Sequence, residues 1–96
     1  MELTFVQSGQ ENGKPLYVAE FEVGAEFNLH IERASEGRLR VYQRTSASGK
    51  YAPVDSFGYQ DNKAVIDYDF SGSIFPKRIR VTSEVQPTLA IVTVVG

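Results

Sequence analysis

Apolar and polar residues alternate with a period of two along most of this chain, and the helical period is hardly visible. Between Leu16 and Val23 the apolar side chains fall on the odd positions, with glutamates among the residues between them. The stretch from Glu26 to Arg33 has the same parity. Because successive side chains of a β-strand point to opposite faces, each stretch predicts a strand with one buried face and one wet face.

The other predicted strands are separated by glycine, proline, serine or asparagine. They cover residues 3–7, 38–44, 50–57, 63–70, 77–81 and 88–95, and a glycine- and asparagine-rich loop is expected over 8–14. Pro53 restricts its strand to a sheet edge or a bulge, because proline cannot donate to a central ladder.

Closely spaced strands with turn residues between them are typical of sandwiches and barrels. A chain of 96 residues matches one domain. We therefore expect a single all-β domain over residues 1–96, an antiparallel β-sandwich or a jelly-roll-like barrel of about eight short strands.

A first hairpin is expected around residues 35–37, where the final glycine suits the left-handed position of a three-residue loop. The register that follows sets Glu32 opposite Arg40 and His30 opposite Tyr42 on the wet face. A slip by one residue would turn every side chain to the other face, so the loop and the alternation agree on this pairing.

A second hairpin is expected between the strand that carries Asp67 and Asp69 and the strand that carries Arg78 and Arg80. In its register, Asp69 faces Arg78 and Asp67 faces Arg80. Exposed pairs of this kind contribute about 0.2–1 kcal/mol each, so they specify register more than stability. Both hairpins therefore predict solvent-exposed faces on which acidic residues of one strand lie opposite basic residues of the next.

One basic stripe surrounds an aromatic residue, which is the composition of a surface that binds single-stranded nucleic acid. The stripe consists of Arg33, Arg38, Arg40, Tyr42 and Arg44. The strand expected beside it carries Glu26, His30 and Glu32, which would neutralise much of its charge. Since the whole chain has a net charge of −2, no nucleic-acid partner is expected.

Catalytic and metal signatures are weak in this sequence. His30 is the single histidine and there is no cysteine, so no zinc-ligand set can be completed from these residue types. The segment that begins Asp67-Tyr68-Asp69 resembles a calcium loop, but its twelfth position is Arg78, where a bidentate carboxylate is needed. We expect no enzyme, no cofactor and no metal ion.

Tyrosines offer the main candidates for a ligand surface. Tyr42 lies within the basic stripe, and Tyr51 and Tyr59 lie close to predicted turns. Packing in the core or in turns is the common role of such residues, but rings on a surface can also stack on sugars. A carbohydrate- or peptide-binding sandwich is therefore the alternative function.

The final predicted strand breaks the alternation, because residues 89–95 are apolar on both faces. A strand of this kind needs burial on both sides, and left on an edge it would favour aggregation. We expect a homo-oligomer, a trimer or a larger ring, with this strand at or beside the interface. The candidate interface residues are Leu89, Ile91, Val92 and Val94.

The beginning of the sequence lacks the basic and apolar regions of a secretion signal, and the longest apolar run is too short to cross a bilayer. The absence of cysteine suits a reducing compartment. A cytoplasmic or virion-associated protein with no membrane partner is expected.

Four stretches of strand pattern carry a resemblance: Phe27–Arg33, Val41–Thr45, Val65–Phe70 and Pro76–Ile79. Together they resemble small all-β proteins of phage and prophage structural modules. The resemblance implies a virion-associated or assembly role in which many copies pack together, with other virion proteins as partners. The expected function is thus a non-enzymatic, self-associating structural or assembly module, with glycan or peptide binding as the alternative.

Overall fold

The computed structural model describes residues 1–46, 48–54, 62–72 and 76–95 of the chain, and these residues form eight strands and no helix. The strands are β1 (Val6–Glu11), β2 (Lys14–Val23), β3 (Phe27–Arg33), β4 (Leu39–Arg44), β5 (Ala52–Pro53), β6 (Val65–Phe70), β7 (Lys77–Ser83) and β8 (Pro87–Val94).

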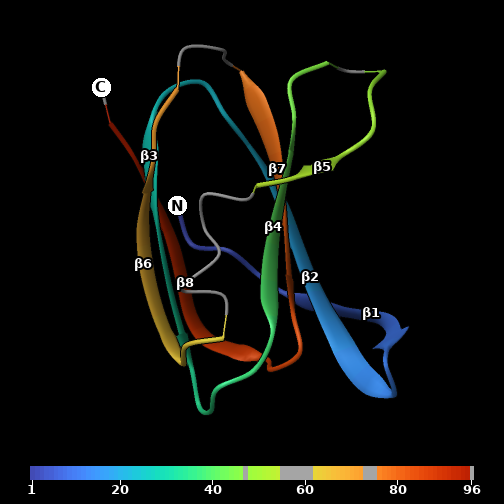
Figure 1. Ribbon diagram of the computed structural model, residues 1–96. Helices are drawn as coiled ribbons and strands as arrows, with labels where there is room; N and C mark the ends of the chain where they lie inside the picture. Colours follow the sequence, from blue (N-terminus) through green and yellow to red (C-terminus); the bar gives the residue numbers. More distant parts are fainter. Residues whose placement is uncertain (47, 55–61, 73–75, 96) are drawn as a thin grey trace.

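The strands form two antiparallel sheets that face each other (Figure 1). A five-stranded sheet has the order β1-β2-β7-β4-β5, and a three-stranded sheet has the order β6-β3-β8. The all-β, sandwich-like fold with eight strands predicted from the alternation is confirmed.

The core lies between the two sheets and is built from the inward positions of the alternating strands. On β3 the buried hydrophobic residues are Phe27, Leu29 and Ile31, which all have odd numbers as predicted. The ring of Phe27 stacks on Phe70 at a centroid distance of 4.8 Å, and it meets Phe21 edge to face at 5.7 Å. These contacts join both sheets, because Phe21 lies on β2 and the other two rings on β3 and β6.

The first predicted hairpin is wrong. β3 pairs with β6 and β8, whereas β4 pairs with β5 and β7 in the other sheet. Residues 34–38 therefore cross between the sheets, and Gly37 is not among the described residues with a positive φ. Alternation distinguishes the buried face of a strand from its wet face, but two strands that face each other across a core alternate in the same way as two neighbours in one sheet.

The second predicted hairpin is also wrong. Asp67 and Asp69 on β6 lie opposite His30 and Asn28 of β3. β7 carries its arginines into the other sheet, between β2 and β4. The acidic and basic residues that were expected to balance each other are thus separated by the core.

The opening strand lies later in the chain than predicted, and the expected loop over 8–14 contains most of it. β1 and β2 form a hairpin in which Glu11 pairs with Lys14 across a two-residue turn. Asn12 and Gly13 have φ values of 53° and 78°, the signs required by a type I′ turn. This asparagine-glycine pair was a hairpin signal in the sequence.

Two segments lie at sheet edges that matter below. β5 is an edge strand, as Pro53 predicted, and β4 is its pairing partner among the described strands. Residues 55–57 of the expected strand lie outside the described residues. At the other sheet, residues 1–3 lie along β8. The Leu3 amide donates to the Ala90 carbonyl at 2.9 Å, and the Val92 amide donates to the Met1 carbonyl at 2.7 Å.

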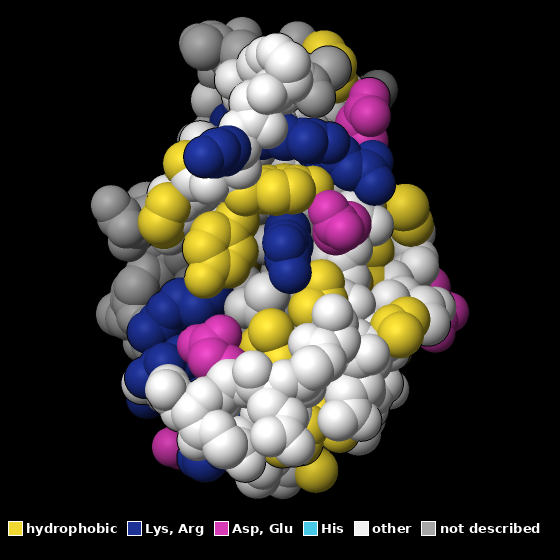
Figure 2. Space-filling model, turned by 90° about the vertical axis from the view of Figure 1, so that its right-hand side faces the viewer, with side chains coloured by type: hydrophobic (Ala, Val, Ile, Leu, Met, Phe, Trp, Pro, Cys, Tyr) yellow, Lys and Arg dark blue, Asp and Glu magenta, His cyan; other side chains and the backbone are white. Residues whose placement is uncertain are grey.

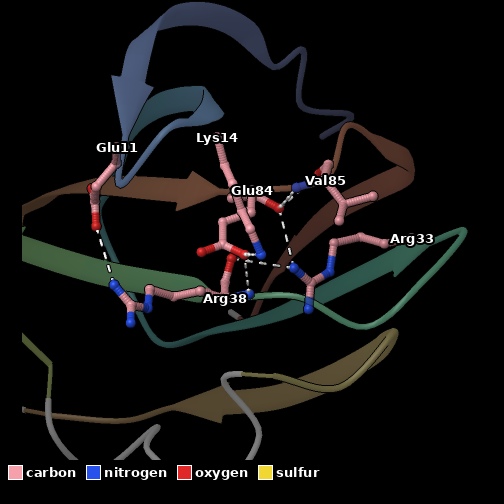
Figure 3. A network of polar contacts seen from close by, with 7 residues as sticks. Glu11, Lys14, Arg33, Arg38, Glu84 and Val85 are labelled. Atoms are coloured by element: carbon pink, nitrogen blue, oxygen red, sulfur yellow. Dashed lines mark hydrogen bonds and ion pairs between the residues drawn. The ribbon is translucent and has the colours of Figure 1, made fainter.

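A polar network connects the two sheets at one end of the sandwich (Figure 3). Arg33 continues the inward row of β3 and is only 4% exposed. Its guanidinium donates to Ser83 Oγ at 3.2 Å, to the Arg38 carbonyl at 3.4 Å and to the Lys63 carbonyl. Burial lowers the pKa of Arg33, an effect that the negative charge of Glu84 opposes. Arg33 therefore holds the segments around β3, β4, β6 and β7 together.

Candidate functional site

The outer face of the five-stranded sheet gathers the arginines of two neighbouring strands. Arg80 of β7 lies opposite Tyr42 of β4, and Arg78 lies opposite Arg44. On the other side of β7, β2 presents glutamates to the same two arginines. Figure 2 shows this face, with dark-blue and yellow side chains grouped together and magenta ones beside them. Two arginines of β7 thus join Tyr42 and Arg44 of the predicted basic stripe, whereas Arg33 of that stripe lies in the core. The glutamates beside these arginines come from β2, where the sequence predicted acidic neighbours from the strand that carries His30.

A hollow of about 260 Å³ opens on this face, and two of the three candidate tyrosines line it. The lining residues are Glu11, Leu16, Tyr42, Tyr51, Arg80 and Thr82. They come from β1, β2, β4, β7 and the segment before β5, so only the finished fold brings them together. The third candidate, Tyr59, lies outside the described residues.

Tyr51 reaches across the sheet from its edge. Its hydroxyl donates a hydrogen bond of 2.6 Å to Glu20 Oε1 on β2, and the Arg44 guanidinium lies over its ring, 5.0 Å from the ring centroid. Burial, and then the hydrogen bond with Glu20, raises the pKa of Tyr51. The hydroxyl therefore stays protonated at neutral pH, and the two contacts hold the ring in place over the sheet.

Arg80 is the basic residue in the lining of this hollow. It is half-buried, and its Nε atom is buried without a hydrogen-bond partner among the described residues. Glu20 is its cross-strand neighbour, yet no carboxylate in the described part of the chain lies within 4.0 Å of the Arg80 guanidinium. Arg80 thus faces the hollow as a cation without a counter-charge in contact.

A second hollow, of about 320 Å³, lies next to the first. Arg44 lines it together with Arg78 and Lys77, and Glu22 is the acidic member of the lining. Because Arg44 also packs over Tyr51, which lines the first hollow, the two hollows adjoin along one face of the sheet.

The outer face of the three-stranded sheet carries a different polar group. His30 lies between two carboxylates, with Nδ1 at 2.8 Å from Asp67 Oδ2 and Nε2 at 2.9 Å from Glu32 Oε2. Asn28 donates to Asp67 at 2.6 Å and to Asp69 at 2.9 Å. The hydrogen bonds with Glu32 and then Asp67 raise the pKa of His30, and those from Asn28 and then His30 lower the pKa of Asp67.

We expect the imidazole of His30 to titrate above its ordinary pKa of 6.5. Its pairing stabilises the fold fully below pH 6.5, and this stabilisation is lost as the pH rises through the folded-state pKa. The contribution of Asp67 has the opposite sign, since it is present above the carboxyl's ordinary pKa of 3.8 and is lost as the pH falls through the lowered value. Each exposed pair contributes at most about 1 kcal/mol.

Proton NMR measures the His30 titration directly, because the chain has a single histidine. The Glu32→Gln and Asp67→Asn variants should each lower the midpoint towards 6.5. A native midpoint at or below 6.5 would contradict the expected pairing.

The candidate interface residues of β8 divide between its two faces. Val92 is fully buried in the core, whereas Leu89 and Ile91 lie half-buried on the outer row. Val94 is 48% exposed near the end of the strand. Residues 1–3 pair with the backbone of β8 at its free edge.

Within the described ranges, no three or more histidine, cysteine, aspartate or glutamate side chains are arranged to hold a metal ion. The same residues contain no helix of the length and hydropathy needed to cross a bilayer.

Sequence reasoning identified Tyr42 and Tyr51 but missed Arg80 and Glu20 as members of the same site. Their wet-face parity was visible in the sequence, but the order of the strands was not. Known protein families, curated proteins and solved structures give no significant match to this chain.

Proposed function

We propose that this protein is a non-enzymatic saccharide-binding module whose site is the hollow between Tyr42, Tyr51 and Arg80. The observation that carries the proposal is the convergence of two aromatic rings and an arginine without a contacting counter-charge in one hollow of the outer sheet.

The lining suits a sugar ring, which has apolar C–H faces and a rim of hydroxyls. Tyrosine rings supply flat apolar surface at a low cost in side-chain entropy. Glu11 and Thr82 supply oxygen atoms that can accept hydrogen bonds from hydroxyl groups. The hollow of about 260 Å³ lies below the range of about 300–1,000 Å³ typical of drug-sized ligands, so it suits one ring of a longer chain.

Binding to a panel of oligosaccharides, measured by glycan array and then by titration calorimetry, tests the proposal. Tyr42→Ala should weaken the binding of any oligosaccharide identified by about tenfold or more, because a stacking aromatic contributes about 1–3 kcal/mol. Tyr42→Phe keeps the ring and should retain most of the affinity. Equal affinities of the native chain and a folded Tyr42→Ala variant would contradict the proposed site.

A second candidate function is self-association through the outer face of the three-stranded sheet, in a structural or assembly role of the phage-module kind. The outer row of β8 supports it, because Leu89 and Ile91 form an apolar row beside the polar residues of β3. Light scattering tests it. A mass equal to one chain at micromolar concentration would contradict it, and a larger mass that Ile91→Asp reduces would support it.

A further inference from the structure

We infer that the saccharide bound at this site is acidic, with carboxylate or sulfate groups on successive sugar units, and that Arg80 binds one of these groups. The inference rests on the proposed saccharide-binding function and names its ligand class. It follows from the charges that the sheet order places on this face.

The inference of an anionic ligand depends on Arg80. A guanidinium is always charged and presents its N–H donors in a fork that matches a carboxylate or a sulfate. In a surface hollow such a group usually finds a carboxylate of its own protein, and Glu20 is in the correct position across the strand pair. Instead, Glu20 accepts the Tyr51 hydroxyl at 2.6 Å, and no carboxylate of the described residues lies within 4.0 Å of the Arg80 guanidinium. The hollow thus has a donor fork ready for an anion of the ligand.

The adjoining hollow extends this arrangement. Arg44 and Arg78 lie opposite each other across β4 and β7, and neither has a carboxylate within 4.0 Å in the described part of the chain. Two like charges in register repel each other unless an anion lies between them. An oligosaccharide with one acidic group in the first hollow can place the next acidic group here. The ligand class is therefore a chain of acidic sugars.

Acidic residues in the same hollows separate this ligand class from a nucleic acid. Glu11 lines the first hollow and Glu22 lines the second. Their carboxylates can accept hydrogen bonds from the hydroxyl groups of a sugar, and the ionised phosphates of a nucleic-acid backbone have no such donors. The mixture of arginine, glutamate and tyrosine thus favours a ligand that carries both anionic groups and hydroxyls.

The experiment compares each acidic oligosaccharide with its own neutral form. The probes are oligomers of galacturonate and of mannuronate, and a sulfated galactan, with carboxyl-reduced or desulfated forms of the same length. We expect the native chain to bind at least one acidic oligomer about tenfold more tightly than its neutral form at low salt, and the difference should shrink as salt is added.

Three variants locate the effect. Arg80→Gln should abolish the preference for the acidic form, so that the acidic and neutral forms of one oligomer bind with similar affinity, while Arg80→Lys should restore only part of the preference. Lys14→Gln removes the same charge from a site outside the hollows and should keep the full preference. Thermal unfolding confirms that each variant is folded.

The outcomes separate the two proposals. Equal binding of acidic and neutral forms, lost on Tyr42→Ala, overturns the acidic ligand and leaves the saccharide site intact. Absence of binding to every oligosaccharide overturns both. Tighter binding of a single-stranded oligonucleotide or an acidic peptide than of any acidic oligosaccharide overturns the ligand class proposed here.

Discussion

A Val92→Asp variant is expected to remain unfolded under conditions in which the native chain folds. The Val92 side chain has no exposed surface and lies in the core between the sheets. Aspartate there must either bury a charge or take up a proton, and it fills the space of the valine with polar atoms. A buried unpaired charge is among the few changes that cost more than about 4–5 kcal/mol, and a small domain has about 5–15 kcal/mol of stability in total.

Far-ultraviolet circular dichroism and urea unfolding measure this effect. The matched control is Thr93→Asp, which places the same side chain on the next residue of β8, where the native threonine is exposed. We expect the free energy of unfolding of this control to lie within about 0.5 kcal/mol of the native value. A cooperatively folded Val92→Asp variant would show that the assignment of Val92 to the core is wrong.

Replacement of Arg33 by methionine is expected to lower the free energy of unfolding by about 2–3 kcal/mol. Methionine can fill the apolar part of the space, but it cannot donate to the Lys63 carbonyl, to Ser83 Oγ or to the Arg38 carbonyl. The loss is moderated because two of these acceptors keep other partners. Ser83 Oγ also accepts the Val85 amide, and the Arg38 carbonyl also accepts the Glu84 amide. Most of the expected destabilisation comes from the Lys63 carbonyl, which loses its hydrogen bond from Arg33.

Urea unfolding with an unchanged m-value measures the Arg33 effect. Arg38→Met is the control within the same network, because the Arg38 side chain is 41% exposed and its ion pair with Glu11 is 3.4 Å long. The Arg38→Met substitution should lower the free energy of unfolding by less than about 1 kcal/mol. If Arg33→Met were as stable as the native chain, the guanidinium would not hold the sheets together.

Much of the fold was predictable, because the alternation reports burial residue by residue. Leu29, Ile31 and Val41 were placed on dry faces from parity alone, and all three are buried. Strand neighbours were not predictable in the same way. Parity is satisfied equally by a partner beside a strand and by a partner across the core, so both predicted hairpins joined strands that belong to different sheets.

Two residues indicate features of the fold that were not predicted, a buried polar network and a tight hairpin. Arg33 occupies the inward parity of β3, and a long cation at a core position indicates a buried polar network. Asn12 begins the strongest short hairpin signal in the chain.

The candidate site depended on topology more than on any single residue. Tyr42 was identified as a surface aromatic, but its expected neighbour was His30, and its neighbours in the sheet are Arg80 and Pro53. With that one change, Tyr42 and Arg44 lie beside Arg80 and Arg78, and the glutamates across from these two arginines come from β2 in place of the strand that carries His30. Errors in strand pairing therefore conceal a binding face even where the outward residues of a strand are correctly predicted from parity.

The pairing of residues 1–3 with β8 affects the risk that the chain aggregates while it folds. The segment of highest aggregation tendency, the aliphatic stretch of β8, has its backbone groups occupied by residues from the opposite end of the sequence. Such a cap forms late, because its contacts join residues that lie far apart in the sequence, such as Leu3 and Ala90. Until it forms, β8 is an open template for other chains. Losses to aggregation are thus expected from partly folded chains, and the native fold is protected by its first three residues.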